Sequence, residues 1–305
     1  YYHRAVALVP QEDFGAQFQV WQAMEKIHDR EGKRDLQKAA CDRLTALSEL
    51  LDDPFLKAEA ALRFSIYYRA INDYPATVQA AEQCIALVQN RSPDQAASAN
   101  VRIGHALWLQ GQYEAARERL EQALKLTQAN GFTDQKLVAE IWRNLGVVLW
   151  FMQDLEGAET RYRRALAYCR AAETRDMRGE AACLNNLGIL AQHREQFDQA
   201  SEFYEQSVEA YQKAGDRQGE GNTLANLGGF AANRGNFPRA IEIFQRVFSL
   251  ALETGDRHGQ GNAQNHLGQI ATHLGQYGAA QEYFDRALAI YEEINDLRGV
   301  GHIHL

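Results

Sequence analysis

Proline is scarce in this sequence, with only five among 305 residues, while Ala and Leu recur throughout. Proline breaks helices, whereas Ala and Leu are strong helix formers, so the chain favours helix almost everywhere. Long apolar runs are also lacking, because the longest, residues 145–152, is too short to cross a bilayer. The sequence therefore gives no reason to expect a membrane partner.

An excess of positive charge is absent as well, since 32 Lys and Arg stand against 40 Asp and Glu and give a net charge of −8. Arginines such as Arg161, Arg163 and Arg164 are interspersed with acidic residues. That mixture is typical of a solvated helix face and differs from the basic stripe that nucleic acid requires. We therefore expect no direct contact with nucleic acid.

Cysteine is rare, and Cys41, Cys84, Cys169 and Cys183 form no Cys-x-x-Cys pair. Each of them lies within an apolar helical pattern. This placement predicts buried free thiols in a reducing, cytoplasmic compartment.

Recognised catalytic and metal-binding motifs are missing, including Gly-x-Ser-x-Gly and His-Glu-x-x-His. The Gly-x-Gly at 219–221 recurs at 259–261 and 299–301, but it follows no strand and lacks the Lys-Ser/Thr of a phosphate-binding loop. His266 and His273 share one helix face, yet no acidic residue or cysteine completes a metal ligand set. We therefore expect no catalytic residues, no cofactor and no metal.

What the chain does contain is a repeat built around the tripeptide Asn-Leu-Gly. The corresponding glycines, Gly104, Gly146, Gly188, Gly228 and Gly268, follow one another after 42, 42, 40 and 40 residues. A fixed period of this length indicates an array of repeated units, each of which packs against its neighbours. Such an array usually presents a surface to a partner.

Other columns keep the same period. Alanine stands twelve residues after each of the five glycines, from Ala116 to Ala280, and a large apolar or aromatic residue stands sixteen after, from Leu120 onward. Glycine and alanine allow two helix backbones to approach closely, and the large side chains fill the space beside them. These columns therefore predict that each unit folds into two antiparallel helices. In the best-formed unit the helices run roughly over 257–274 and 276–294.

The turns support this division. Gly-Gln-Tyr at 275–277 joins the two helices of one unit, and glycine at a helix end is an expected stop signal. Gly-Asp-Arg at 215–217 and 255–257 joins successive units, and the Asp of this linker can cap the helix that follows.

Over residues 93–305 the pattern resembles the tetratricopeptide repeat, because the Leu-Gly, the aromatic residue at the turn, the Ala and the later aromatic residue stand at that family's offsets. The usual unit has 34 residues, while these have 40 to 42. The longer unit is similar to the arrays of kinesin light chains and LGN-type mitotic adaptors. The resemblance implies an all-α, right-handed superhelical solenoid of antiparallel helix pairs, with about seven hairpins and a truncated helix.

We expect a single array over residues 1–305. Its parts are the tail of a preceding helix over 1–10, two degenerate hairpins over 11–90, five regular repeats over 93–294 and a truncated repeat over 297–305. The stretch 11–90 also resembles the helical arms that follow the nucleotide-binding core of STAND-type ATPases and MalT-like activators. This second resemblance implies a sensor or assembly arm of a larger bacterial regulator.

In the resembling arrays the first helix of each pair lines a concave groove. The residue two before each glycine is Arg102, Asn144, Asn186, Asn226 or His266 in turn. An Asn amide has both donors and an acceptor, so a column of them can hold an extended peptide backbone, and the resemblance implies such contacts. The alternative is that these amides bond the neighbouring repeat and fix the curvature of the array.

Aromatic residues extend this surface at one end, where Trp108 and Trp150 stand four residues after their glycines. A tryptophan with a polar edge is a typical binding anchor. The alternative is that both tryptophans pack in the core between repeats. The predicted partner-contacting residues are Arg102, His105, Trp108, Arg143, Asn144, Trp150, Asn185, Asn186, Gln192, Asn222, Asn226, Asn262, Asn265, His266 and Gln269.

The sequence therefore predicts a module that binds a peptide or a helical segment of a partner protein in its groove. The alternative is the sensor or assembly arm of a STAND-type ATPase. Self-association through exposed terminal repeats is a further expectation. The identity of the partner does not follow from the repeat, because fold does not fix function.

Overall fold

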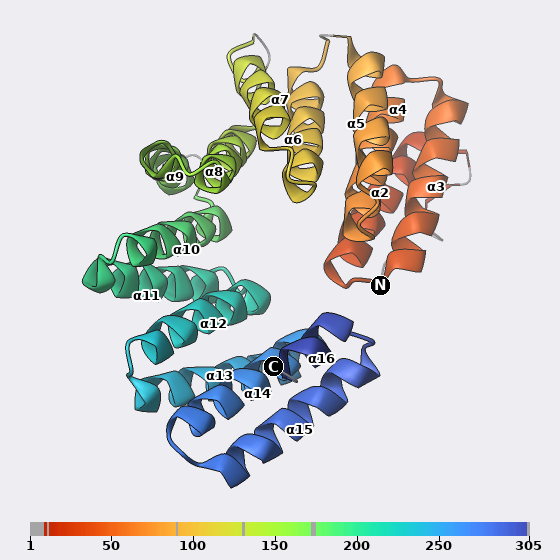
Figure 1. The fold of residues 1–305 in the computed structure, drawn as a ribbon. Coiled ribbons are helices and arrows are strands. Elements are labelled where there is room, and N and C mark those ends of the chain that lie inside the picture. The colour runs from red at the N-terminus through yellow and green to blue at the C-terminus, as the bar shows by residue number, and fades with distance from the viewer. Residues whose placement is uncertain (1–8, 11, 90, 130–131, 172–174, 304–305) are drawn as a thin grey trace. The chain divides into compact units, whose positions relative to one another are not determined.

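A computed structural model describes residues 9–10, 12–89, 91–129, 132–171 and 175–303. Over these residues the secondary structure is helical and contains no strand. Short turns join the helices into antiparallel pairs, as Figure 1 shows. The chain divides into two compact units, Tyr1–Arg161 and Tyr162–Leu305.

The first unit contains the pairs α2–α3, α4–α5 and α6–α7, followed by α8 and the beginning of α9 (Figure 1). The bounds are α2 Phe14–Arg30, α3 Arg34–Leu51, α4 Pro54–Ala70, α5 Tyr74–Val88, α6 Pro93–Leu109, α7 Tyr113–Leu126, α8 Gln135–Phe151 and α9 Leu155–Arg170. We call the first helix of each pair an A helix and the second a B helix.

The second unit contains the end of α9, the pairs α10–α11, α12–α13 and α14–α15, and the short α16 (Figure 1). The bounds are α10 Met177–His193, α11 Phe197–Lys213, α12 Arg217–Asn233, α13 Phe237–Thr254, α14 Arg257–His273, α15 Tyr277–Glu293 and α16 Leu297–Ile303.

The all-α architecture of paired helices predicted from the repeat is thus confirmed. The best-formed pair, expected at roughly 257–274 and 276–294, is α14 and α15. The two degenerate hairpins expected within 11–90 are α2–α3 and α4–α5. The expected helical tail over 1–10 lies almost wholly outside the described residues, and one continuous array over 1–305 stays a prediction.

The two helices pack together in each of the pairs α2–α3, α4–α5, α6–α7, α10–α11, α12–α13 and α14–α15. Within each unit, the second helix of a pair also packs against the helix that follows, as α3 does against α4 and α11 against α12. In addition, α4 contacts α6 and α6 contacts α8 in the first unit, while α10 contacts α12 and α12 contacts α14 in the second. Within each unit, successive A helices therefore lie against one another. This arrangement brings residues one repeat apart in the sequence onto one surface.

Four of the repeated glycines, Gly104, Gly188, Gly228 and Gly268, are covered by the large side chain sixteen residues further on. A Cβ atom added to Gly188 would lie 2.8 Å from Cδ1 of Tyr204, and one added to Gly268 would lie 2.7 Å from Cε1 of Phe284. Such distances are too short for real carbon atoms, so only glycine fits. The ring rests directly on the glycine and does not merely flank it, which refines the packing expected from the sequence.

Aspartate caps begin the A helices of the second unit. Asp176, Asp216 and Asp256 each accept a hydrogen bond from the backbone N–H three residues on, at 3.1, 3.0 and 2.9 Å. The side chain satisfies one of the N–H groups that a helix start leaves without an intrahelical partner. The capping role expected for the Gly-Asp-Arg linkers is confirmed.

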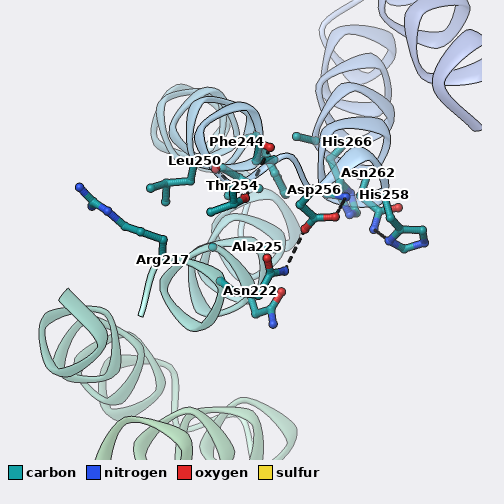
Figure 2. A pocket seen from close by; sticks show the side chains of 16 residues that line it. Arg217, Asn222, Ala225, Phe244, Leu250, Thr254, Asp256, His258, Asn262 and His266 are labelled. Carbon is teal, nitrogen blue, oxygen red and sulfur yellow. Dashed lines mark hydrogen bonds between the residues drawn. The ribbon is translucent and has the colours of Figure 1, made fainter. Parts of the chain in front are cut away.

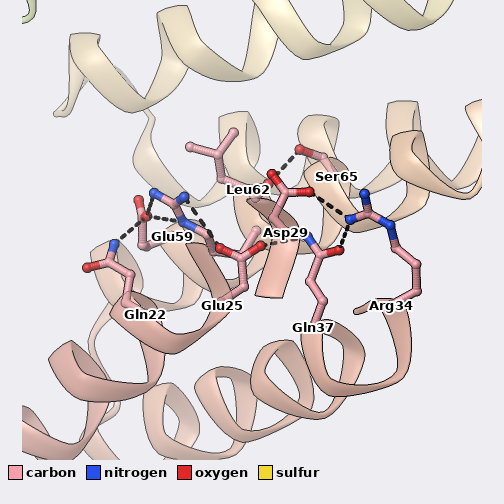
Figure 3. A network of polar contacts seen from close by, with 9 residues as sticks. Gln22, Glu25, Asp29, Arg34, Gln37, Glu59, Leu62 and Ser65 are labelled. Atoms are coloured by element: carbon pink, nitrogen blue, oxygen red, sulfur yellow. Dashed lines mark hydrogen bonds and ion pairs between the residues drawn. The ribbon is translucent and has the colours of Figure 1, made fainter. Parts of the chain in front are cut away.

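The first two pairs lack the glycine signature, and a polar network joins α2, α3 and α4 (Figure 3). Arg63 on α4 bonds Glu59 at 2.8 Å from Nε and lies 3.6 Å from the carboxylate of Glu25 on α2. Gln37 on α3 donates to Glu25 at 2.8 Å. Ser65, which takes the place of the glycine, is fully buried and donates to the Leu62 carbonyl at 2.6 Å. The Ser65 bond stays within α4, so polar contacts stand here where the later repeats have glycine.

Candidate functional site

The fifteen predicted partner-contacting residues all lie on the A helices α6, α8, α10, α12 and α14. Most of them are half-buried, while Asn222 and Gln269 are exposed. Six of them belong to the first unit, and the remaining nine, from Asn185 onward, belong to the second. Because successive A helices contact one another within each unit, every unit presents its own surface of these residues.

The asparagine column has two kinds of member. Asn226 donates from Nδ2 to Oδ1 of Asn185 on the preceding A helix at 2.9 Å. Asn144 and Asn186 are half-buried, and no described residue forms a hydrogen bond with either side chain. The amide of Asn226 therefore joins neighbouring repeats, as the alternative interpretation expected, whereas those of Asn144 and Asn186 remain open to a ligand.

Asn265 corrects the sequence-based expectation of an accessible site. Its side chain is only 8% exposed, and its Oδ1 atom is buried. It occupies the same repeat position as Asn185, three residues before the glycine, and Asn185 faces the following A helix. This position points into the packing between helices and away from the open surface.

Other predicted residues are held by contacts within the protein. Gln192 accepts a hydrogen bond from the buried Tyr204 hydroxyl at 2.9 Å. Asn262 accepts one from Tyr291 at 2.7 Å, and its Nδ2 lies 3.0 Å from Nδ1 of His258. These side chains have fixed positions and keep fewer free donors and acceptors than the sequence suggested.

The aromatic end of the surface lies on α6 and α8 in the first unit. The ring of Trp108 stacks on His105 with centroids 5.1 Å apart, and it lies 5.7 Å from the ring of Phe151 on the next A helix. Burial, with the nearby charges of Arg69 and Arg102, lowers the pKa of His105 to about 4. At neutral pH His105 is therefore uncharged, and Trp108 both packs between repeats and borders the surface.

A pocket of about 190 Å³ opens between α12 and α14 in the second unit (Figure 2). Phe244, Val247 and Leu250 of α13 form an apolar floor, and Asn222 of α12 and Asn262 of α14 line its sides. Figure 2 shows Arg217 extending away from the other labelled side chains. The pocket thus combines an apolar interior with amide groups beside it.

His266 contributes to the same pocket and stacks on Phe244, with ring centroids 4.6 Å apart. Burial lowers the pKa of His266, while a hydrogen bond with Gln269 acts in the opposite direction. The ring is therefore neutral at physiological pH. The pocket wall offers hydrogen bonds and apolar contact here without a histidine charge.

Sequence reasoning missed the polar contacts that connect successive A helices. Arg178 lies 3.2 Å from the cap residue Asp216, and Gln218 donates to the cap residue Asp256 at 2.9 Å. Each pair is 38 residues apart, so the second residue of one A helix contacts the cap of the next. The recurrence of Asp at this spacing was the available signal. It shows that the linker aspartates join repeats in addition to capping helices.

A second cavity, of about 310 Å³, lies among α3, α4 and α5 of the first unit and contains none of the predicted residues. Among the described residues, no group of three or more His, Cys, Asp or Glu side chains is arranged to hold a metal ion. In the same part of the chain, no helix has the length and apolar character needed to cross a membrane. The four cysteines are buried free thiols.

Comparison with known families matches the tetratricopeptide repeat to residues 94–171, 137–213 and 219–293. These segments cover more than half of the sequence, and the chain belongs to the tetratricopeptide repeat family. No curated protein sequence matches it at a significant level.

Solved structures with this fold share little sequence with the chain. A STAND protein with a tetratricopeptide repeat sensor from Pyrococcus horikoshii has a TM-score of 0.71 and 18% identity, over 97% of this chain and 43% of that one. NprR in complex with its cognate peptide NprX has a TM-score of 0.61 and 14% identity, over 97% and 83% of the two chains.

A kinesin light chain-like protein of Podospora anserina with nearly identical TPR-like repeats has a TM-score of 0.53 and 18% identity, over 67% of this chain and 97% of that one. At such identities the similarity establishes the repeat fold that the sequence predicted, and nothing about the partner of this chain.

Proposed function

We propose that this protein is an interaction module that binds a peptide or a helical segment of a partner protein on its A-helix surface. The observation that carries the proposal is the pocket between α12 and α14, with its apolar floor and its amide-bearing sides. The complex of NprR with a peptide supports the proposal by analogy of fold. The protein acts by binding and needs no catalytic group.

The pocket suits one side chain of a partner. Its floor of Phe244, Val247 and Leu250 can receive an apolar group, and each methylene removed from water contributes about 0.8 kcal/mol. Asn222 is exposed and forms no hydrogen bond with a described residue, so its amide is free to bond the partner's backbone. An apolar anchor with a backbone contact beside it is a common arrangement in peptide recognition.

Blocking the pocket tests this assignment. A Cβ added to Gly221, which lines the pocket, would meet no atom within 4 Å, so Gly221→Leu should fill the pocket without disturbing the fold. Gly278 on α15 is equally open but lies on an exposed B helix, so Gly278→Leu is the matched control. Peptides selected from a random display library on the unmodified protein should bind Gly221→Leu at least tenfold more weakly and bind the control unchanged. Equal binding to both variants would show that the pocket takes no part.

The asparagines give a second test. Asn186→Ala should weaken peptide binding and leave stability unchanged, since no described residue bonds the Asn186 amide. Asn226→Ala should lower stability by about 1 kcal/mol, because it removes the hydrogen bond to Asn185. Urea denaturation and fluorescence anisotropy with one selected peptide separate these effects. Loss of stability in Asn186→Ala would instead assign that residue to the packing of the array.

A second candidate function is the sensor or assembly arm of a larger STAND-type regulator. It is favoured by the structural similarity to the Pyrococcus horikoshii protein, of which this chain spans 43%. Sequencing the intact gene tests it: a phosphate-binding loop motif upstream in the same reading frame supports this role, and its absence refutes it. Self-association through terminal repeats also stays a proposal, which sedimentation over a concentration series would test.

A further inference from the structure

Three arginines lie on successive A helices of the first unit: Arg69 on α4, Arg102 on α6 and Arg143 on α8. We call them the arginine cluster. One carboxylate, that of Glu140 on α8, lies beside them, with Oε1 3.5 Å from Nη2 of Arg102. The charges of all three arginines act on Glu140 and on the neutral His105, so the five groups share one neighbourhood.

The cluster carries uncompensated positive charge. Among the described residues no carboxylate forms an ion pair with Arg69 or Arg143, and the Nε atoms of Arg69 and Arg102 are buried without a hydrogen-bond partner. Asp29 also acts on Arg69, but it is already paired with Arg34 at 2.7 Å. Three guanidinium groups against the single carboxylate of Glu140 leave two positive charges unmatched.

The pKa of Glu140 agrees with this excess of positive charge. Burial raises the pKa of Glu140, but the charges of Arg102 and Arg143 outweigh it and hold the pKa below its usual range. Burial and the charge of Arg102 lower the pKa of Arg69. Burial is the larger of these two causes, and the like charge of Arg102 adds to it.

The excess charge stands out because the chain as a whole is acidic, with a net charge of −8. The side chains of Arg102 and Glu140 are 22% and 28% exposed, so the cluster is reachable from solvent yet shielded enough to strengthen electrostatic contacts. Guanidinium groups bind carboxylate and phosphate groups with two parallel hydrogen bonds. The stacked rings of His105 and Trp108 on the same helix give an adjacent flat apolar face.

We propose that the arginine cluster binds a doubly anionic group of a peptide partner, either two adjacent carboxylates or one phosphorylated side chain, and that Glu140 is the resident counter-charge which competes with it. This inference rests on the proposed peptide-binding function and adds the chemistry of the partner. A dianion matches the two unmatched charges, since a phosphorylated side chain carries about −1.5 to −2 at neutral pH. Nucleic acid is disfavoured, because its affinity depends on many spaced phosphate contacts.

The competing role of Glu140 provides a test in which one variant gains affinity. Peptides should first be selected from a random display library on the unmodified protein, and the strongest binder with an acidic pair should be synthesised. Arg69→Gln and Arg143→Gln should each weaken its binding about tenfold, whereas Glu140→Gln should strengthen it about threefold or more. Arg117 on the B helix α7 pairs with Glu114 and is 39% exposed, so Arg117→Gln is the control and should change nothing.

Three synthetic forms of this peptide identify the source of the charge: one with the acidic pair, one with phosphoserine in its place and one with two glutamines. If the acidic-pair form binds more tightly, two carboxylates are the preferred group, and if the phosphoserine form does, a phosphate is. The glutamine form should bind at least tenfold more weakly than either. Affinity for the charged forms should also fall as salt is raised, because screening weakens exposed ion pairs. Circular dichroism confirms that every variant is folded.

The outcomes are distinct. Selected peptides that lack acidic pairs, or that bind Arg143→Gln and Glu140→Gln as tightly as the unmodified protein, overturn the role of the arginine cluster and leave the peptide-binding function standing. Failure to select any peptide overturns the peptide-binding function itself. Binding of a duplex oligonucleotide in preference to the charged peptides would replace the peptide partner by nucleic acid.

Discussion

Replacing a helical glycine of the second unit by alanine should lower stability at Gly188 and raise it at Gly221. Gly188 on α10 lies under the ring of Tyr204, and an added Cβ would lie 2.8 Å from both Cδ1 and Cε1. The ring cannot easily move, because it is 1% exposed and its hydroxyl donates to Gln192 at 2.9 Å. Gly221 on α12, by contrast, has no atom within 4 Å of the same added carbon.

The magnitudes follow from two opposing effects. Alanine in place of glycine in a helix interior stabilises by about 1 kcal/mol, and overpacking a close-packed contact costs about 1–3 kcal/mol. Gly221→Ala gains helix propensity without any clash and should be more stable by about 1 kcal/mol. In Gly188→Ala the overpacking cost against Tyr204 outweighs the gain in helix propensity, so this variant should be less stable by up to about 2 kcal/mol.

Urea denaturation followed by far-UV circular dichroism measures the difference, with thermal melting as a second readout. Introducing Tyr204→Ala supplies an internal control, since the space freed by the ring should make Gly188→Ala neutral or stabilising in that background. Equal stabilisation by Gly188→Ala and Gly221→Ala in the unmodified protein would refute the reasoning that ring-on-glycine contact selects glycine at this column.

Three further predictions concern turns, caps and buried charge. Glu195 has a φ of 60° in the turn of α10–α11, so Glu195→Gly should stabilise the fold and raise the thermal midpoint. Gly235→Ala, at a φ of 75°, should cost about 1 kcal/mol of unfolding free energy and lower the thermal midpoint, and shifts of the same sign in both variants would contradict the strain argument. Asp256→Ala removes both a helix cap and the contact with the preceding A helix and should cost about 1–2 kcal/mol in urea denaturation, whereas Asp256→Asn should keep most of that stability. Burial raises the pKa of Glu25, so the folded state binds this proton more tightly than the unfolded state does. The stability it contributes is complete below the unfolded pKa and is lost as pH rises through the folded pKa. The urea midpoint of Glu25→Gln should therefore fall less with rising pH than that of the unmodified protein, and parallel curves would exclude Glu25 as the cause.

Much of the architecture could be predicted from the sequence, because the same packing residues recur in each repeat. The glycine and alanine columns marked the helix pairs, and the aspartates before each A helix marked their starts. The candidate site could be predicted from the sequence only in part. A spacing of 3.6 residues per turn identifies the face of a helix but not the partner of each side chain, so Asn226 and Asn186 looked alike although only Asn226 is bonded to a neighbour.

The sequence by itself determined the repeat, the paired helices and the set of A helices that carry the candidate surface, since each depends on local spacing and on residues that recur every 40 to 42 positions. Only the tertiary structure decided which residues of that surface are available. It buried Asn265, bonded Gln192 to Tyr204, and assembled Arg69, Arg102, Arg143 and Glu140 from three helices. The physical reason is that helix spacing is a property of neighbouring residues, whereas burial, hydrogen bonding and charge balance depend on contacts between side chains that lie a whole repeat apart in the sequence.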